Sequence, residues 1–275
     1  MPESDHSDRF VEASMAYIVD TGAKPVSASY GPGTSVHTHT GTYQEQRVRV
    51  ENGRGREDAF SLDREGFRLA RHETQVKDFY DEDEVRAVYY PELEDLVKRE
   101  TGCVRVHIFD HTRRAGDDAT REARHVKGPV RHVHNDYTDW SGPQRVRDIL
   151  PDEADALLRH RLQVVQVWRA VRGPIHSSPL GICDARSIAP KDLIATERRY
   201  PNRVGEIYHV AYNPAHHWFY FPEMTRDEAL VFKCYDSRHD VARFTVHSAF
   251  TDPTTPKGAP PRESMEARLL CFFAD

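Results

Sequence analysis

Two side chains that can bind a metal, His134 and Asp136, stand two positions apart in the segment 128–138. Side chains alternate between the faces of a β-strand, so on a strand both residues would point to one face and reach one ion. One imidazole and one carboxylate from a strand, joined by a distant histidine, form the facial triad that holds Fe(II) and leaves positions open for a cosubstrate and O₂. A His-x-Asp pair alone often occurs by chance. Its place among several expected strands is what predicts a metal site.

Later histidines are the candidates for the third ligand: His209, His216, His217, His239 and His247. His216 and His217 follow an Asn-Pro pair that is typical of a turn, and His239 lies in a polar loop. His209 is explained at least as well as a core histidine with satisfied hydrogen bonds. His247 lies one expected strand before the last, where a double-stranded β-helix has its distal ligand. We therefore predict that His247 completes the triad.

Two arginines near the C-terminus are candidates for binding the far carboxylate of 2-oxoglutarate. Arg268 stands near the start of an apolar segment, where a buried guanidinium needs an anion. That anion is either an internal Asp or Glu or the cosubstrate. Arg262 and Ser264 form an Arg-x-Ser arrangement that is typical of 2-oxoglutarate binding, but we expect Arg262 in a solvated, proline-bounded loop. The cost of desolvation therefore favours Arg268 as the clamp.

The elements that must position these residues are mainly strands. Short segments rich in aromatic and β-branched residues, bounded by turn-forming residues, predict strands at 103–109, 130–137, 162–171, 180–186, 204–212, 218–221, 229–235, 244–250 and 267–273. Such spacing is typical of a sandwich, a jelly roll or a barrel. We predict a mainly β fold with added helices and a double-stranded β-helix, or cupin-like jelly-roll, core.

Helices are expected in two places. The first spans 81–101, with Asp81 as its N-cap, a kink at Pro91 and a stop at Gly102. The second helical stretch lies between residues 143 and 160. We expect one domain over 1–275, in which residues 1–60 form an irregular N-terminal extension.

Composition limits the classes of function. The chain has 275 residues, of which 38% are hydrophobic, and its 12 Phe and 12 Tyr provide for a sizeable core. A net charge of −6 argues against a nucleic-acid binder, and no stretch approaches the ~20 apolar residues of a membrane span. The four cysteines, without a CxxC pair, are typical of reduced thiols in a cytoplasmic protein. The 16 histidines direct attention to metal chemistry.

Short motifs from about Phe60 onward are specific when taken jointly: 60–67, 76–80, 106–111, 134–138, 167–169, 183–186, 218–222, 232–237, 247–250 and 261–264. Through them the chain resembles the CmcJ/NvfI-type non-haem iron oxygenases, a family that includes the bacterial cephem 7α-methoxylation component, the fungal NvfI-type oxygenases and gibberellin desaturase. The resemblance implies a double-stranded β-helix, iron, and usually 2-oxoglutarate-dependent oxidation in secondary metabolism. It carries His134, Asp136 and His247 over as ligands. Arg262 and Arg268 both fall in the family's terminal pattern, so the choice between them stays open.

Three further residues are candidates for contacts with the substrate or with the metal ligands. Tyr137 follows the ligand pair directly and is a candidate hydrogen-bonding partner of the ligands. Arg169 could pair with the substrate or cosubstrate, or equally form a structural salt bridge. Lys233 alternates with apolar neighbours and could point inward. The first 60 residues match the family poorly, which makes them a candidate region for substrate recognition.

We therefore expect a cytoplasmic Fe(II)/2-oxoglutarate-dependent dioxygenase. It would use O₂ to hydroxylate, desaturate or oxidatively cyclise a small molecule of secondary metabolism. One alternative is an accessory component that partners another tailoring enzyme such as a methyltransferase, because the cephem family member works in a two-protein system. Another is an iron oxygenase that does not use 2-oxoglutarate. A partner enzyme or a homodimer stays open, and neither nucleic acid nor a membrane is an expected partner.

Overall fold

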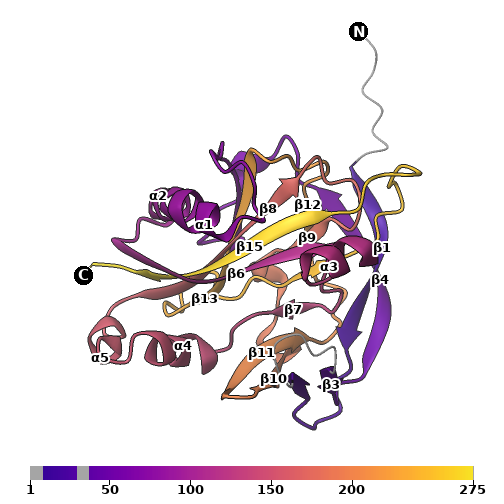
Figure 1. Cartoon of the computed structure of the whole chain (residues 1–275). Coiled ribbons are helices and arrows are strands. Elements are labelled where there is room, and N and C mark those ends of the chain that lie inside the picture. Colours follow the sequence, from indigo (N-terminus) through magenta and orange to yellow (C-terminus); the bar gives the residue numbers. More distant parts are fainter. Residues whose placement is uncertain (1–8, 30–36, 275) are drawn as a thin grey trace.

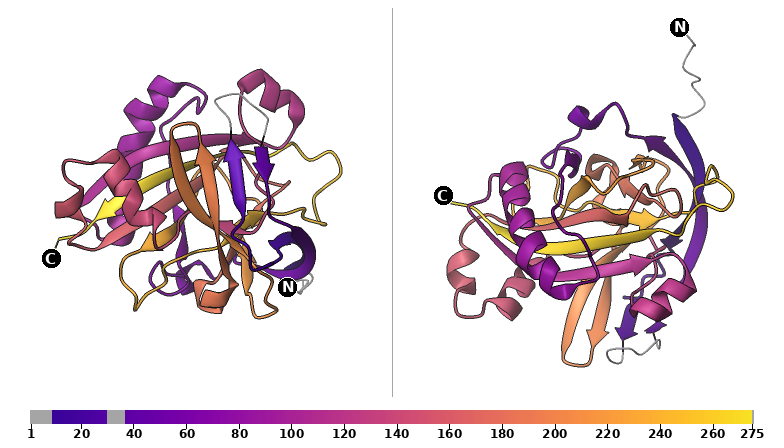
Figure 2. Two further views of the ribbon diagram at one scale, coloured as in Figure 1. Left: turned by 90° about the horizontal axis from the view of Figure 1, so that it is seen from below. Right: turned by 45° about the horizontal axis from the view of Figure 1, so that its top comes forward.

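Two β-sheets that face each other across a shared core form the body of the molecule (Figures 1 and 2). The computed structural model describes residues 9–29 and 37–274. Over these residues one sheet has ten strands, in the order β1-β4-β12-β9-β14-β7-β11-β10-β2-β3, and the other has five, in the order β5-β13-β8-β15-β6. The arrangement is the jelly roll that the strand pattern predicts.

The ten-stranded sheet contains β1 (Phe10–Ile18), β2 (Val26–Ser29), β3 (His37–His39), β4 (Tyr43–Asn52), β7 (His134–Asn135), β9 (Leu180–Cys183), β10 (Leu193–Tyr200), β11 (Arg203–Val210), β12 (Trp218–Tyr220) and β14 (His247–Ala249). The five-stranded sheet contains β5 (Phe67–Arg71), β6 (Arg105–Ala115), β8 (Leu162–Arg172), β13 (Glu228–Asp236) and β15 (Glu263–Phe272). The helices are α1 (Glu82–Glu84), α2 (Tyr90–Thr101), α3 (Asp118–Arg124), α4 (Ser141–Ile149) and α5 (Ala154–Leu157), with a π-helical turn at Val85–Tyr89. Single 3₁₀ turns lie at Glu57–Ala59, Ala185–Ser187 and Pro190–Asp192.

The five-stranded sheet is buried on both faces. In β8, Val164 and Trp168 pack in the core between the sheets, whereas Val165 and Val167 pack in a second cluster beneath α2. Figures 1 and 2 show α1 and α2 on the outer side of the sheet that contains β15 and β6. Because side chains alternate along a strand, the even-numbered positions of β15 point into the space between the sheets. This alternation turns three polar side chains of β15 toward the interior: Ser264, Glu266 and Arg268.

The helix predicted over 81–101 is confirmed. The Asp81 side chain accepts hydrogen bonds from the backbone N–H groups of Asp83 and Glu84, at 2.9 and 3.2 Å. Gly102 ends the helix in the left-handed conformation, with φ at +75°, which costs glycine little. Pro91 lies in the first turn of α2, directly after the π-helical turn, so the helix divides at the position expected for a kink. The second helical stretch forms two short helices, α4 and α5.

The expectation of an irregular segment over residues 1–60 is wrong for the described part of it. β1 pairs with β4 along nine residue pairs, from Phe10↔Glu51 to Ile18↔Tyr43, and β4 pairs with β12. The physical reason is that these strands are stabilised by partners distant in the sequence, which a local pattern does not show. The N-terminal strands therefore belong to the same sheet as the predicted metal ligands.

The last strand begins earlier than the sequence predicts. β15 starts at Glu263, pairing with β6 and β8 on its two sides, and Arg262 directly precedes it. Arg262 is consequently buried, with 2% of its surface exposed, and the expectation of a solvated loop at this residue is wrong. None of the helices in the described ranges is both long and apolar enough to cross a membrane.

Candidate metal and cosubstrate site

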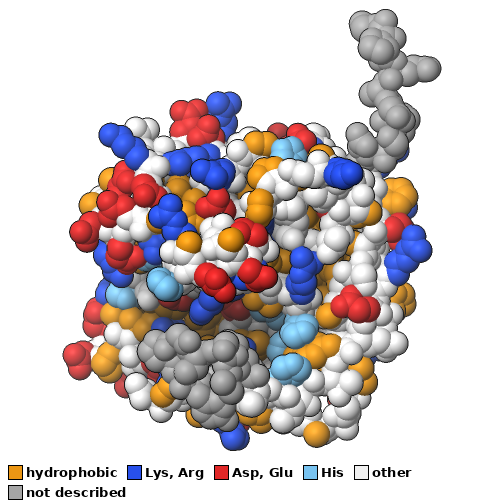
Figure 3. Space-filling view, turned by 45° about the vertical axis from the view of Figure 1, so that its right-hand side comes forward, with side chains coloured by type: hydrophobic (Ala, Val, Ile, Leu, Met, Phe, Trp, Pro, Cys, Tyr) orange, Lys and Arg blue, Asp and Glu red, His pale blue; other side chains and the backbone are white. Residues whose placement is uncertain are grey.

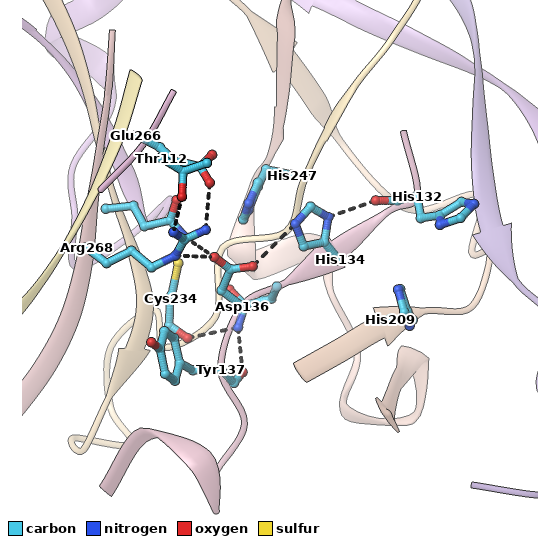
Figure 4. Close-up of polar contacts among 12 residues, drawn as sticks. Thr112, His132, His134, Asp136, Tyr137, His209, Cys234, His247, Glu266 and Arg268 are labelled. Carbon is cyan, nitrogen blue, oxygen red and sulfur yellow. Dashed lines mark hydrogen bonds and ion pairs between the residues drawn. The ribbon is translucent and has the colours of Figure 1, made fainter. Parts of the chain in front are cut away.

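His134, Asp136 and His247 converge at neighbouring strands of the ten-stranded sheet (Figure 4). β7 carries His134, β14 carries His247, and the two histidines are direct partners in the antiparallel pairing of these strands. One potential ligand atom from each of the three residues lies within 4.8 Å of the others. Within the described residues, no other group of three His, Cys, Asp or Glu side chains meets this criterion. The structure therefore brings together the three residues predicted from the sequence.

Both imidazoles are oriented by backbone carbonyl groups. Nδ1 of His134 lies 2.8 Å from the carbonyl oxygen of His132, and Nδ1 of His247 lies 3.1 Å from that of Thr245. A carbonyl only accepts hydrogen bonds, so each Nδ1 carries a proton and each Nε2 is the ring nitrogen left to face a metal. Burial, together with nearby His134, lowers the pKa of His247 to about 4, so its ring is neutral. Neutral rings with a free Nε2 are the form in which histidine binds a metal.

The Asp136 carboxylate is held by one oxygen and leaves the other facing the imidazoles. Oδ2 accepts hydrogen bonds from Nε2 of Gln166 and, at 2.8 Å, from Nε of Arg268. Oδ1 lies 3.4 Å from Nε2 of His134. Burial alone would raise the pKa of the Asp136 carboxyl. The Arg268 guanidinium and the two imidazoles outweigh that effect and hold the pKa well below its usual range. The carboxylate is therefore ionised and oriented for a metal ion before any ion binds.

Arg268 finds its anions within the protein. Besides Asp136, its guanidinium donates to Asp110 at 2.9 Å and to Glu266 at 2.6 Å. Glu266 also accepts from Arg114 at 2.7 Å. The sequence argument that a buried Arg268 requires an anion is correct, but three carboxylates already meet that requirement. Its N–H groups are used in orienting a metal ligand, which leaves little capacity for a second carboxylate.

Arg262 and Ser264 are also buried, but unlike Arg268 they have donor groups without a partner. Nη1 of Arg262 donates to the Ser178 carbonyl at 2.7 Å, while its buried Nε has no hydrogen-bond partner. The buried hydroxyl of Ser264 also has none. No salt bridge within the described residues includes Arg262, and burial, with Arg114 nearby, lowers the pKa of its guanidinium to about 9. A buried cation and an unpaired hydroxyl two positions apart in the chain are groups that an anion would stabilise.

Of the other three predicted site residues, one lies at the cavity and two make contacts elsewhere in the protein. Tyr137 lines the same cavity as His134 and Asp136. Arg169 lies on the outer face of β8, where its guanidinium is within 5.0 Å of the centre of the Tyr89 ring, so its role is in packing beneath α2. Lys233 donates to Asp63 at 2.9 Å and to Asp236 at 2.8 Å in a separate buried network. These contacts favour the structural alternative for Arg169 and Lys233.

The cavity at the ligands has a volume of about 290 Å³. His39, Tyr43, His132 and His209 line one side of it, and none of them was predicted to lie at the site except His209, as a rival ligand. Figure 3 shows a group of histidine side chains beside a hollow on this face. His209 is paired in register with His134, but its ring lies 3.0 Å from the Thr196 hydroxyl, and burial lowers its pKa to about 2. The surplus of histidine was the one sequence signal for this cluster.

Comparisons with known proteins identify the relatives of the chain. A family model described as the oxidoreductase/YMDC permease-like domain matches residues 15–272. The chain is 36% identical over 256 residues to the hydroxylase/desaturase CTB9 of Cercospora beticola. This alignment covers 85% of this chain and 78% of the relative. It is 31% identical over 237 residues to the Fe(II)/2-oxoglutarate-dependent dioxygenase nvfI of Aspergillus novofumigatus, covering 82% and 83% of the two chains. The solved structure of the iron and alpha-ketoglutarate-dependent endoperoxidase NvfI superposes with a TM-score of 0.87 at 26% identity, covering 98% of this chain and all of that one.

Proposed function

The chain belongs to the family of the oxidoreductase/YMDC permease-like domain and is a relative of the fungal hydroxylase/desaturases and Fe(II)/2-oxoglutarate-dependent dioxygenases. On this basis we propose that it is an Fe(II)- and 2-oxoglutarate-dependent oxygenase. Its substrate is a small molecule of secondary metabolism, which it hydroxylates, desaturates or oxidatively cyclises. It works as a single domain.

The convergence of His134, Asp136 and His247 carries this proposal. Two imidazoles and one carboxylate are the donor set that suits Fe(II) and leaves part of its coordination open. The two Nε2 atoms and Oδ1 of Asp136 would hold the ion. When bound, iron and 2-oxoglutarate together supply the activation of O₂ that allows an unactivated C–H bond to be oxidised.

The charges around the site fit a cosubstrate with two negative charges. The residues that line the cavity include six Lys and Arg against four Asp and Glu, and Arg262 is a further buried cation. A divalent cation at the ligands would add to this positive charge, which a dianion such as 2-oxoglutarate offsets. Arg262 is the guanidinium with donor capacity left for its far carboxylate, and the Ser264 hydroxyl adds a second donor. We therefore assign the clamp to Arg262 and Ser264.

The other residues of the site position these groups. Gln166 and Arg268 fix the carboxylate of Asp136 in the orientation that presents Oδ1 to the ion. Glu266 holds Arg268 in place and is itself bound by Arg114. Removing any member leaves a partner buried with an unsatisfied charge, so the network keeps the ligand rigid.

The experiment is succinate formation from 2-oxoglutarate by the purified protein. Iron-loaded enzyme is supplied with O₂, with and without 2-oxoglutarate, in the presence of candidate small molecules. Succinate that depends on both iron and 2-oxoglutarate supports the proposal. Oxygen consumption that is independent of 2-oxoglutarate would instead support an iron oxygenase of another kind.

The setting in which the enzyme works is part of the same proposal. We propose a cytoplasmic location, supported by four buried cysteines that are all free thiols. We also propose a partner enzyme, as in the two-protein system of the cephem family member, or a second copy of the chain. Sedimentation of the purified protein, alone and mixed with a candidate tailoring methyltransferase, tests that part.

A further inference from the structure

Four ring side chains form a continuous wall of the cavity on the side away from the Arg268 network. This aromatic wall consists of His39, Tyr43, His132 and His209. Tyr43 stacks on His132, with ring centres 3.9 Å apart and planes 9° apart, and meets the rings of His39 and His209 edge-on, each at 5.3 Å. In Figure 4, His132 and His209 lie on one side of His134, and Glu266 and Arg268 lie on the other.

Hydrogen bonds within the aromatic wall fix its geometry. The Tyr43 hydroxyl lies 3.2 Å from a ring nitrogen of His209, and Nδ1 of His209 lies 3.0 Å from the Thr196 hydroxyl. Nδ1 of His39 lies 3.1 Å from the Gly41 carbonyl. The partners are hydroxyl and carbonyl groups, so none of these contacts brings a carboxylate or a guanidinium into the aromatic wall. It offers ring faces and neutral polar atoms.

The mouth of the cavity has apolar side chains that are exposed. Trp140 and Val204 line it and are 49% and 50% exposed. Large apolar side chains left in solvent at the edge of a concave site are typical of a ligand-binding surface. Together with the aromatic wall, they give the cavity ring and apolar surfaces, beside charged side chains that also line it, among them Arg198, Arg203 and Glu206.

We propose that the aromatic wall binds the substrate by the face of a planar, unsaturated ring that carries a hydroxyl or carbonyl group. Stacking on Tyr43 and His132 places that ring beside His134, because His132 is two residues from this ligand. The neutral polar atoms of the aromatic wall bind the oxygen substituent. The inference rests on the proposed function and names the substrate class for that site.

The test is direct binding of a probe to the metal-free protein and to the protein loaded with Zn(II), measured by calorimetry. The probe is 2-naphthol, compared with its saturated analogue decahydro-2-naphthol. We expect 2-naphthol to bind about tenfold more tightly than the saturated analogue. Tyr43→Leu and His132→Leu should each weaken 2-naphthol binding about tenfold, while Tyr43→Phe, which keeps the ring, should change it less than about threefold.

Tyr212→Leu is the matched control, because Tyr212 is an exposed ring outside the cavity. It should leave 2-naphthol binding unchanged. Equal affinity for the aromatic and saturated probes, unchanged affinity in Tyr43→Leu and His132→Leu, or no binding of 2-naphthol would each overturn the inference. Binding of 2-oxoglutarate to the same Zn(II)-loaded samples tests the proposed function separately. Loss of that binding does not alter what the naphthol probes report.

Discussion

Replacing Arg262 by glutamine separates the two candidate clamps, with Arg268→Gln as the matched control. Glutamine keeps an N–H donor for the Ser178 carbonyl, which Arg262 reaches at 2.7 Å, but removes the positive charge. No carboxylate is left unpaired by this change, because Arg262 has no salt-bridge partner among the described residues. Arg268→Gln removes the partner of Asp136, Asp110 and Glu266 together.

Arg262→Gln should therefore weaken 2-oxoglutarate binding without lowering stability, whereas Arg268→Gln should mainly lower stability. Losing a charge-assisted contact in a desolvated site costs about 2–5 kcal/mol. The 2-oxoglutarate concentration that Arg262→Gln needs for half-maximal succinate formation should increase by a factor between roughly 30 and several thousand, since every ~1.4 kcal/mol is a factor of ten. Its free energy of unfolding should stay within about 1 kcal/mol of the wild type or rise, because an uncompensated buried charge is removed. Arg268→Gln should lose about 3–5 kcal/mol of stability, because it leaves buried carboxylates without their cation.

The assays are succinate formation as a function of 2-oxoglutarate concentration and urea unfolding of the same metal-free proteins. An Arg262→Gln variant with an unchanged 2-oxoglutarate requirement refutes the assignment of the clamp. A stable, folded Arg268→Gln variant with a steeply raised requirement would restore the choice favoured by the sequence. Arg262→Lys is a further comparison, since a point charge without the planar fork should recover part of the lost affinity.

Three further predictions concern the ligands, the pH dependence and the thiols. Gln166→Leu releases one hydrogen bond to Oδ2 of Asp136, so Fe(II) affinity should fall roughly 10–100-fold, as measured by competition with a chelating dye. Burial, together with nearby His134 and His132, lowers the pKa of His209 from 6.5 to about 2, so below pH 6.5 the unfolded chain takes up a proton that the folded protein does not. Stability of the metal-free protein should therefore fall with falling pH in this window by up to about 1.4 kcal/mol per pH unit from this residue, and His209→Asn should remove that part of the slope in urea titrations. All four cysteines should react as free thiols in the denatured protein without reductant, and a mobility change on reduction would contradict this.

The sequence was sufficient where the determining pattern is local. The i, i+2 spacing of His134 and Asp136 places both on one face at the end of β7, and the periodicity of 85–97 with Asp81 and Gly102 at its ends defines the helix. His247 was predicted over His209 from its place one strand before the last. Both histidines are buried beside His134, and only the fold distinguishes the one that meets Asp136 from the one that meets Thr196.

The rest depended on contacts between distant residues. Strand β1 has no local signal strong enough to predict it, because its nine pairs are made with β4 some thirty residues later. The preference for Arg268 as the clamp rests on a solvated Arg262, whereas the start of β15 at Glu263 makes Arg262 a desolvated cation and gives Arg268 the partners Asp110 and Glu266. Which acids surround a buried arginine is not readable from its neighbours in the chain.

The most direct test of the account is anaerobic titration of the apoprotein with Fe(II). We predict one Fe(II) per chain in the wild type, and loss of that binding in His134→Ala, Asp136→Ala and His247→Ala while circular dichroism shows a retained fold. His209→Ala should still bind one Fe(II), because the His209 side chain is engaged by Thr196 and Tyr43 and not by Asp136. Fe(II) binding that survives in His247→Ala and is lost in His209→Ala would contradict the central claim that His134, Asp136 and His247 form the metal site.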